Sequence, residues 1–276
     1  MSQDNILKLL NVIIDLIDKN ENIDEFLDLF LKLDNVCIDK LLFIFQNIKN
    51  KNSIKSIMKI IDKLYIDNNL SIVVARYNEN IDWVKKYKNV IVYNKGNTSE
   101  LENSQIPFIK VDNVGREGHT FLYHIINNYD NLSNWIVFVQ GNPFDHCPNF
   151  YEKIDKIYEN INNNLELSDE FNLSNNFNFL SNNFNFLSDT IYYSNISNCP
   201  YHSNIPLKKV YNDVFNTNDD DKPIIFSPGA QFYVSKKLIL TKPKIYYEKI
   251  LKLLDYDINP IEGFCIERLW KYIFEN

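Results

Sequence analysis

The chain has 276 residues, of which 45% are hydrophobic and 24% charged, and its net charge at pH 7 is −7. This is the composition of an ordinary globular protein with a sizeable core, and the acidic balance argues against a nucleic-acid binder that uses a general basic surface. No apolar run approaches the roughly 20 residues that span a bilayer, so no membrane span is expected.

The cysteines favour a reducing compartment. They form no CxxC pair, and their spacings suit neither a zinc ribbon nor a disulfide framework. The N-terminus lacks the basic segment and apolar core of a signal peptide. We therefore expect a cytoplasmic location, which for a viral chain would be the host cytoplasm or a virus factory. The four cysteines are Cys37, Cys147, Cys199 and Cys265.

Residues 1–67 contain four apolar stripes with helical spacing and neither glycine nor proline. The first stripe includes Ile6, Leu9 and Leu10, and the other three follow the same pattern. The spacing predicts a small antiparallel helical bundle. Because the segment carries no cluster of ligand-type residues, we expect it to serve in packing or in docking a protein partner.

From residue 68 the pattern changes to short apolar runs, with a predicted helix from Thr120 to Tyr129. The alternation of strands and helices predicts βαβ units with parallel strands and right-handed crossovers. Residues 68–276 are therefore expected to form an α/β domain, a mostly parallel sheet with flanking helices. The polar clusters after the strands then lie at one edge of the sheet. The apolar runs are residues 71–75, 90–93, 108–111 and 136–139.

The second half of this domain contains a short duplication. Residues 175–181 are repeated without change at 182–188. Two copies are too few for a solenoid, so we predict a mobile surface insertion over about 165–190. Residues 191–222 look irregular. Further predicted elements are strands at 224–226 and 231–234 and helices at 246–254 and 261–274.

Six segments in order carry a resemblance to a known family: VVARYNE, YNKG, GREGHTFLYHIINNYD, FVQGNPFDH, FSPGAQFYVS and IERLW. Over roughly residues 70–275 the chain resembles an uncharacterised domain family found in fungi, bacteria and large DNA viruses. Its members look like glycosyltransferases of the GT-A type. The turn from Arg76 to Glu79 is similar to the nucleotide-contacting turn of GT-A enzymes, and the acidic C-terminal helix adds to the likeness.

The resemblance implies a GT-A-like, Rossmann-type fold that transfers a sugar from a nucleotide-sugar donor to a hydroxyl of a glycan or protein acceptor. No organic cofactor is expected. Two alternatives stay open. One is a non-catalytic module of the same fold that binds a sugar or nucleotide. The other is a metal-dependent phosphohydrolase built on His119, Asp145 and His146.

Sugar transfer requires stabilisation of the leaving diphosphate, for which Arg76, Lys95 and Arg116 are cationic candidates. The alternative for each is a surface or ion-paired side chain. Asn78 and Glu79 are candidates for contacts to base or ribose, or else form an Asx turn and helix cap. The full predicted substrate-binding set is Arg76, Asn78, Glu79, Lys95, Arg116, Glu117, His119, Gln140, Asn142, Gly229 and Gln231.

GT-A enzymes usually carry Asp-x-Asp after the fourth strand, whereas this chain has QGNPFDH over residues 140–146. Asp145 and His146 are candidate ligands of Mn²⁺ or Mg²⁺, and Asp145 is also a candidate catalytic carboxylate. Alternatively, Asp145 caps a turn and His146 packs. Glu267 is the candidate general base. Its alternatives are an i,i+4 surface pair with Lys271 or another ion pair within the last helix. His124 is expected to be a core histidine.

Overall fold

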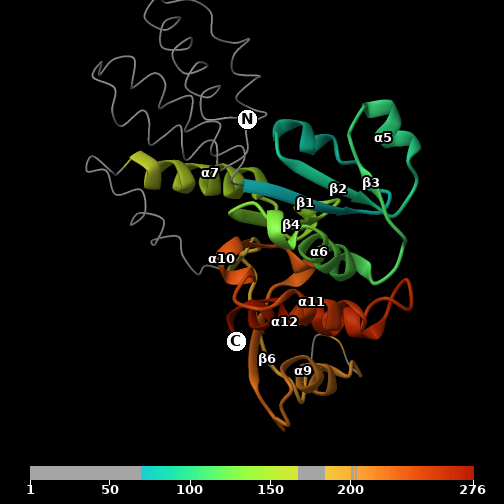
Figure 1. The fold of residues 1–276 in the computed structure, drawn as a ribbon, viewed down its shortest axis with the longest axis vertical. Coiled ribbons are helices and arrows are strands. Elements are labelled where there is room, and N and C mark those ends of the chain that lie inside the picture. Colours follow the sequence, from blue (N-terminus) through green and yellow to red (C-terminus); the bar gives the residue numbers. More distant parts are fainter. Residues whose placement is uncertain (1–69, 167–183, 200–201, 203) are drawn as a thin grey trace, which may run out of the picture. The chain divides into compact units, whose positions relative to one another are not determined.

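The computed structural model describes residues 70–166, 184–199, 202 and 204–276 (Figure 1). All of them belong to the second of the two units into which the chain divides, Leu70–Asn276. The bundle predicted for residues 1–67 and most of the predicted insertion lie outside the described residues. Within these ranges, no helix has the length and apolar character needed to cross a membrane.

The strands are β1 (Leu70–Arg76), β2 (Val90–Asn94), β3 (Ile109–Lys110), β4 (Trp135–Gln140), β5 (Phe184–Phe186), β6 (Tyr192–Asn195), β7 (Pro223–Phe226) and β8 (Phe232–Ser235). The α-helices are α5 (Ser99–Ser104), α6 (Arg116–Asn127), α7 (Phe150–Glu166), α9 (Leu207–Phe215), α10 (Lys236–Ile239), α11 (Lys244–Leu251) and α12 (Ile261–Glu275). The 3₁₀ helices are η1 (Asp82–Lys86), η2 (Tyr129–Asn131), η3 (Pro143–Asp145) and η4 (Pro228–Ala230).

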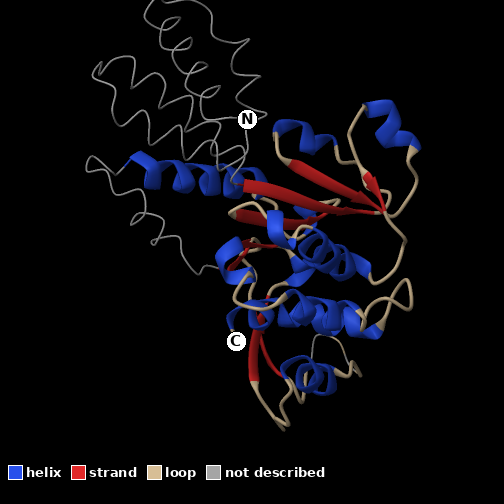
Figure 2. Cartoon of the chain, viewed as in Figure 1, coloured by secondary structure: helices blue, strands red, loops and turns tan. Residues whose placement is uncertain are grey.

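The main sheet has six strands in the order β3-β2-β1-β4-β8-β5. Strands β1 to β4 run parallel, while β8 is antiparallel to β4 and to β5. This confirms the predicted α/β domain with a mostly parallel sheet and flanking helices. A separate ribbon pairs β6 with β7 antiparallel, and Figure 2 shows it apart from the main sheet.

The central strands are buried on both faces, as expected for parallel strands covered by helices. Every residue of β1 is buried. One face of the sheet contributes Val73, Phe138 and Phe232 to a core that also contains residues of α6, α11 and α12. Phe121 of α6 packs on Phe138 with ring centroids 5.0 Å apart. In Figure 1, α6 lies beside the sheet, and α11 and α12 lie beyond it.

Close packing brings the segment before α12 against α6. A Cβ added to Gly118 of α6 would lie 3.3 Å from Leu254 Cδ1 and 3.8 Å from both Ile266 Cγ2 and Trp270 Cζ2. A glycine at this helical position therefore lets Leu254 and the side chains of α12 approach the α6 backbone. The side chains at the start of α6 and in the middle of α12 become neighbours as a result.

The structure differs from the predictions in the second half of the domain. The second copy of the duplicated segment supplies β5, where Phe184 is buried and pairs with Val234, so this end of the predicted mobile insertion is an ordered edge strand. The stretch 191–222, predicted to be irregular, contains β6 and α9. Its apolar residues have partners: Leu207, Val210 and Tyr211 are buried.

His124 is the core histidine that the sequence predicts. Its Nδ1 lies 3.1 Å from the Tyr93 hydroxyl oxygen and 3.3 Å from Asn128 Nδ2. Burial lowers the pKa of His124 to about 4. The unfolded chain therefore binds this proton at a higher pH than the folded chain does, and the stability that depends on a neutral His124 is lost as pH falls from 6.5 toward 4.

We predict that the free energy of unfolding falls by roughly 2 kcal/mol more in the wild type than in His124→Gln between about pH 7 and pH 4.5. Glutamine does not titrate, so the comparison removes the contributions that both proteins share. Urea unfolding at a series of pH values measures this difference. Parallel pH dependence in the two proteins would contradict a buried, neutral His124.

Candidate functional site

The sheet has a topological switch point between β1 and β4. The chain runs outward from β1 through β2 to β3, then returns to place β4 on the other side of β1. In open α/β sheets, ligands bind outside the carboxyl ends of the strands at such a point. Here β1 ends at Arg76, β2 at Asn94 and β4 at Gln140, so the predicted polar clusters do meet at one edge.

Arg76 links the segments that meet at this edge of the sheet. Its side chain is 1% exposed, and its guanidinium donates from Nη1 to Asn94 Oδ1 at 2.8 Å and from Nε to the Glu79 carbonyl at 2.8 Å. Nη2 pairs with Glu100 Oε2 at 3.0 Å. The predicted diphosphate ligand is thus bonded to protein groups, and it ties the end of β1 to β2 and α5.

Asn78 and Glu79 form the turn above Arg76. The Asn97 backbone N–H donates to Asn78 Oδ1 at 2.9 Å, and the Tyr77 N–H donates to Glu79 Oε2 at 2.7 Å. The Glu79 carboxylate lies across the switch point, because a Cβ added to Gly141 would sit 2.6 Å from Glu79 Oε2. Only a residue without a side chain lets β1 and β4 end so close to this carboxylate.

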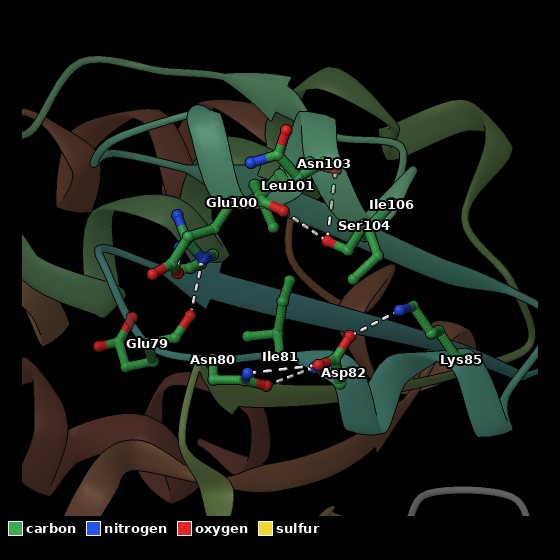
Figure 3. A pocket seen from close by; sticks show the side chains of 11 residues that line it. Glu79, Asn80, Ile81, Asp82, Lys85, Glu100, Leu101, Asn103, Ser104 and Ile106 are labelled. Atoms are coloured by element: carbon green, nitrogen blue, oxygen red, sulfur yellow. Dashed lines mark hydrogen bonds and ion pairs between the residues drawn. The ribbon is translucent and has the colours of Figure 1, made fainter.

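A pocket of about 380 Å³ opens beside this turn, between η1 and α5 (Figure 3). Figure 3 shows Ile81 pointing between the two elements, with polar side chains around it. Both cations of the lining have carboxylate partners: Arg76 pairs with Glu100, and Lys85 pairs with Asp82 at 2.6 Å. The lining is Arg76, Glu79, Asn80, Ile81, Asp82, Lys85, Glu100, Leu101, Asn103, Ser104 and Ile106.

The sequence did not predict this pocket. The helix α5 carries only one buried residue, Leu101, and has no amphipathic pattern that marks it. The one sequence feature that could have indicated the pocket is the spacing of three between Asp82 and Lys85. That spacing is typical of any exposed helix, so it does not identify a pocket.

The second part of the edge is the turn that begins α6. Gly115 and Arg116 both have left-handed backbone conformations, with φ of 65° and 54°. For a residue other than glycine this conformation costs roughly 1–2 kcal/mol. The Lys95 ammonium donates to the carbonyls of Val114 and Arg116. The Gly115 N–H donates to the Asp257 carbonyl at 2.8 Å. The turn is therefore bonded both to the end of β2 and to the segment before α12.

Two carboxylates interact electrostatically beside this turn. The side chains of Glu117 and Glu267 are 10% and 13% exposed. Burial raises the pKa of Glu117, the Arg116 charge lowers it, and the Glu267 charge raises it again. The Arg116 Nε lies 3.6 Å from Glu117 Oε2. Glu267 has a guanidinium neighbour of its own, because Arg268 Nη1 lies 3.8 Å from Glu267 Oε2. Nearly buried carboxyl groups beside cations are candidates for proton transfer next to a charged substrate.

Gly229 joins Glu267 to the loop that follows β4. The Gly229 N–H donates to Glu267 Oε1 at 3.0 Å. Gly229 has φ 79°, and a Cβ there would lie 2.3 Å from His146 Cδ2. The His146 ring therefore packs directly on the glycine backbone. The structure thus brings together residues that the sequence predicted in five separate segments: Lys95, Arg116, Glu117, His146, Gly229 and Glu267.

One family model covers nearly all of the described residues. The model described as "Protein of unknown function (DUF3431)" matches residues 72–276. The chain belongs to the DUF3431 family. No curated protein and no solved structure matches the chain. The DUF3431 domain starts inside β1 and ends with the chain, so it contains the switch point, the Gly115 turn and the carboxylate pair.

The remaining residues of the DUF3431 domain that were predicted as site residues after β4 and near β8 differ in burial. Asp145 is exposed, and Gln140 and Asn142 are half-buried. Gln231 is fully buried, its Nε2 donates to the Pro143 carbonyl at 3.1 Å, and its Oε1 has no hydrogen-bond partner. Gln231 therefore fixes the loop that carries η3.

The predicted metal ligands do not form a cage. No three His, Cys, Asp or Glu side chains in the described part of the DUF3431 domain lie close enough together to hold a metal ion. Asp145 is exposed, and the His146 ring is packed on Gly229. Mg²⁺ and Mn²⁺ prefer several oxygen ligands in octahedral geometry. Asp145 and His146 do not fit such a site by themselves.

His119 supports the Gly115 turn. Its ring is buried, and its Nε2 lies 3.3 Å from Asp255 Oδ1, in the segment that precedes α12. Burial lowers the pKa of His119 and the Lys95 charge lowers it further, while Asp255 opposes both. Its Nδ1 has no hydrogen-bond partner. The ring therefore connects the first turn of α6 to the segment that positions α12.

Proposed function

We propose that the DUF3431 domain is a GT-A-like glycosyltransferase that moves a sugar from a nucleotide-sugar donor to a hydroxyl acceptor. The observation that carries this proposal is the pair of nearly buried, electrostatically interacting carboxyl groups of Glu117 and Glu267 beside Arg116, at the edge where β1 and β4 end. A donor at this edge has its reacting carbon near two carboxyl groups and its diphosphate near a cation. Both features lower the barrier to sugar transfer.

In this proposal, Glu267 accepts the proton of the acceptor hydroxyl while the hydroxyl oxygen bonds to the anomeric carbon. The bond from that carbon to the diphosphate oxygen breaks, and Arg116 balances the charge on the departing diphosphate. Arg116 suits this role because its side chain is 24% exposed and its polar partners are distant, with Asn259 Oδ1 at 3.4 Å and Glu117 Oε2 at 3.6 Å. Burial raises the pKa of Glu117, which disfavours the charged form of this carboxyl group beside the diphosphate.

The pocket between η1 and α5 receives the nucleoside in the same proposal. It adjoins the Glu79 turn, and its volume lies within the range of small-ligand sites, about 300–1,000 Å³. Its rim offers carboxylate and amide oxygens, which accept hydrogen bonds from ribose hydroxyls and base N–H groups. Ile81 and Leu101 supply an apolar surface for the flat face of a base.

One observation favours a second candidate, a module that binds the sugar nucleotide without turnover. Two of the three predicted diphosphate cations, Arg76 and Lys95, are bonded to protein groups. Arg116 is then the single predicted cation left for the leaving group. Binding requires less charge compensation than bond cleavage does, so both candidates predict the same ligand but differ in turnover.

Thermal unfolding with nucleotide sugars tests the proposal. A ligand at about 100 times its Kd adds roughly 2.7 kcal/mol of stability, so we expect a UDP- or GDP-sugar at millimolar concentration to raise the Tm by several degrees, with and without Mn²⁺. Arg116→Met should abolish this rise in Tm, while replacement of the exposed Lys208 of α9 in Lys208→Met should leave it unchanged. Slow release of free sugar from the donor distinguishes the enzyme from the binding module. If no nucleotide sugar changes the Tm, both candidates fail.

A further inference from the structure

The Lys95 ammonium is bonded to the backbone of the Gly115 turn. It donates to the carbonyls of Val114 and Arg116, the residues on either side of Gly115. Lys95 follows directly on Asn94, the last residue of β2. The two hydrogen bonds therefore tie the end of β2 to the start of α6.

This turn requires external support. Arg116 has a β-carbon and yet adopts φ 54°, directly after Gly115 at φ 65°. Two successive left-handed residues are disfavoured in an L-amino-acid chain, and such strain persists where the surrounding structure fixes it. A second tie comes from the segment before α12, where the Asp257 carbonyl accepts from the Gly115 N–H at 2.8 Å.

The turn sets the direction of the two side chains that follow it. The Arg116 guanidinium carbon lies 4.0 Å from the centroid of the Phe264 ring, and Glu117 begins the nearly buried carboxylate pair. If Gly115 and Arg116 left the left-handed conformation, the backbone would rotate and the side chains of Arg116 and Glu117 would shift with it. A displacement of about 1 Å at a reacting group can cost 100-fold in rate.

We infer that Lys95 is a positioning residue, which holds Arg116 and Glu117 in the geometry for sugar transfer by bonding the carbonyls of Val114 and Arg116, and that it does not bind the donor diphosphate. This inference rests on the proposed function for its catalytic half only. Burial lowers the pKa of Lys95 to about 8, and the nearby Glu117 charge opposes that shift. The group is therefore still mainly an ammonium at neutral pH.

Hydrogen–deuterium exchange tests the structural half without any substrate. In Lys95→Met, amides of residues 114–118 should exchange at least about 10-fold faster than in the wild type, while those of β4 stay unchanged. Lys95→Arg, which keeps donors and charge, should restore most of the protection. The control Lys208→Met replaces an exposed lysine that pairs with Asp220, and it should behave as the wild type. Unchanged exchange in Lys95→Met would overturn the inference.

Kinetics tests the catalytic half. We expect Lys95→Met to lower kcat for donor turnover by about 10- to 100-fold, with the Kd of UDP or GDP within about two-fold of the wild type. A weakened nucleotide Kd with unchanged kcat would instead identify Lys95 as a diphosphate ligand.

The pH profile adds a readout that loose packing alone would not move. The Lys95 charge lowers the pKa of Glu117, so its removal should shift the limb of the profile that reports Glu117 ionisation to higher pH, and Lys95→Arg should return it. An unshifted limb would count against the inference. A wild type without turnover would defeat the proposed function and leave the exchange result to decide the position of Lys95.

Discussion

Glu267→Gln is expected to lower the rate of sugar transfer by at least about 100-fold, the usual contribution of a general base. Glutamine has the same shape, and its amide oxygen can still accept the Gly229 N–H that Glu267 Oε1 accepts at 3.0 Å. It loses the capacity to take a proton from the acceptor hydroxyl, and also the charge that lies 3.8 Å from Arg268 Nη1. The loss should therefore be in kcat, with the Kd of the nucleotide and the Tm close to those of the wild type.

Glu275→Gln is the matched control for this experiment. Glu275 lies on the same helix, is exposed, and pairs with Lys271 rather than with the carboxylate site. We expect its rate to be that of the wild type. Donor turnover that is equal in Glu267→Gln and Glu275→Gln would remove Glu267 from the reaction and leave the binding module as the better description.

Gly229→Ala is expected to destabilise the domain by roughly 2–4 kcal/mol, from two causes that add. The new Cβ would lie 2.3 Å from His146 Cδ2 and 2.7 Å from His146 Cγ, and the backbone at φ 79° disfavours any residue with a β-carbon. Urea unfolding measures the loss. Because the Gly229 N–H bonds Glu267, turnover by the remaining folded protein should fall as well.

A double variant separates the two causes. His146→Ala removes the ring that the new methyl group meets, so Gly229→Ala with His146→Ala should be more stable than the sum of the single changes by about 1 kcal/mol or more. Gly118→Ala serves as the control glycine, because its nearest neighbour is the flexible Leu254 side chain at 3.3 Å. It should stay within about 1 kcal/mol of the wild type. Full additivity would show that His146 does not pack on Gly229.

The sheet could be predicted from the sequence because its strands are short apolar runs that end at polar clusters. Parallel strands buried on both faces produce such runs, and β1, β2 and β4 lie where the runs predict them. The strand β5 could not be predicted in this way. Its FNF sequence occurs twice in the duplicated segment, so nothing local marks the copy at 184–186 as the partner of β8.

The sequence predicted which residues lie in the candidate site better than it predicted what each side chain does there. The sequence shows that Arg76 and Lys95 follow strands, but not that backbone carbonyls take up their hydrogen bonds, because this depends on turns from other segments. The neighbourhood of Glu117 and Glu267 depends on α12 packing against Gly118. Such a contact between distant segments leaves no periodic signal in one sequence. The Asp145 and His146 pair stays a prediction of sequence alone.

The central claim is that a nucleotide diphosphate binds at the Gly115 turn, with its nucleoside toward the Glu79 turn. A crystal structure of the full chain soaked with UDP or GDP and Mn²⁺ tests it most directly. We expect diphosphate oxygens within hydrogen-bonding distance of the Arg116 guanidinium, the base in the pocket between η1 and α5, and the Glu267 carboxylate facing the place of the sugar. A nucleotide bound away from both Arg116 and this pocket would contradict the claim.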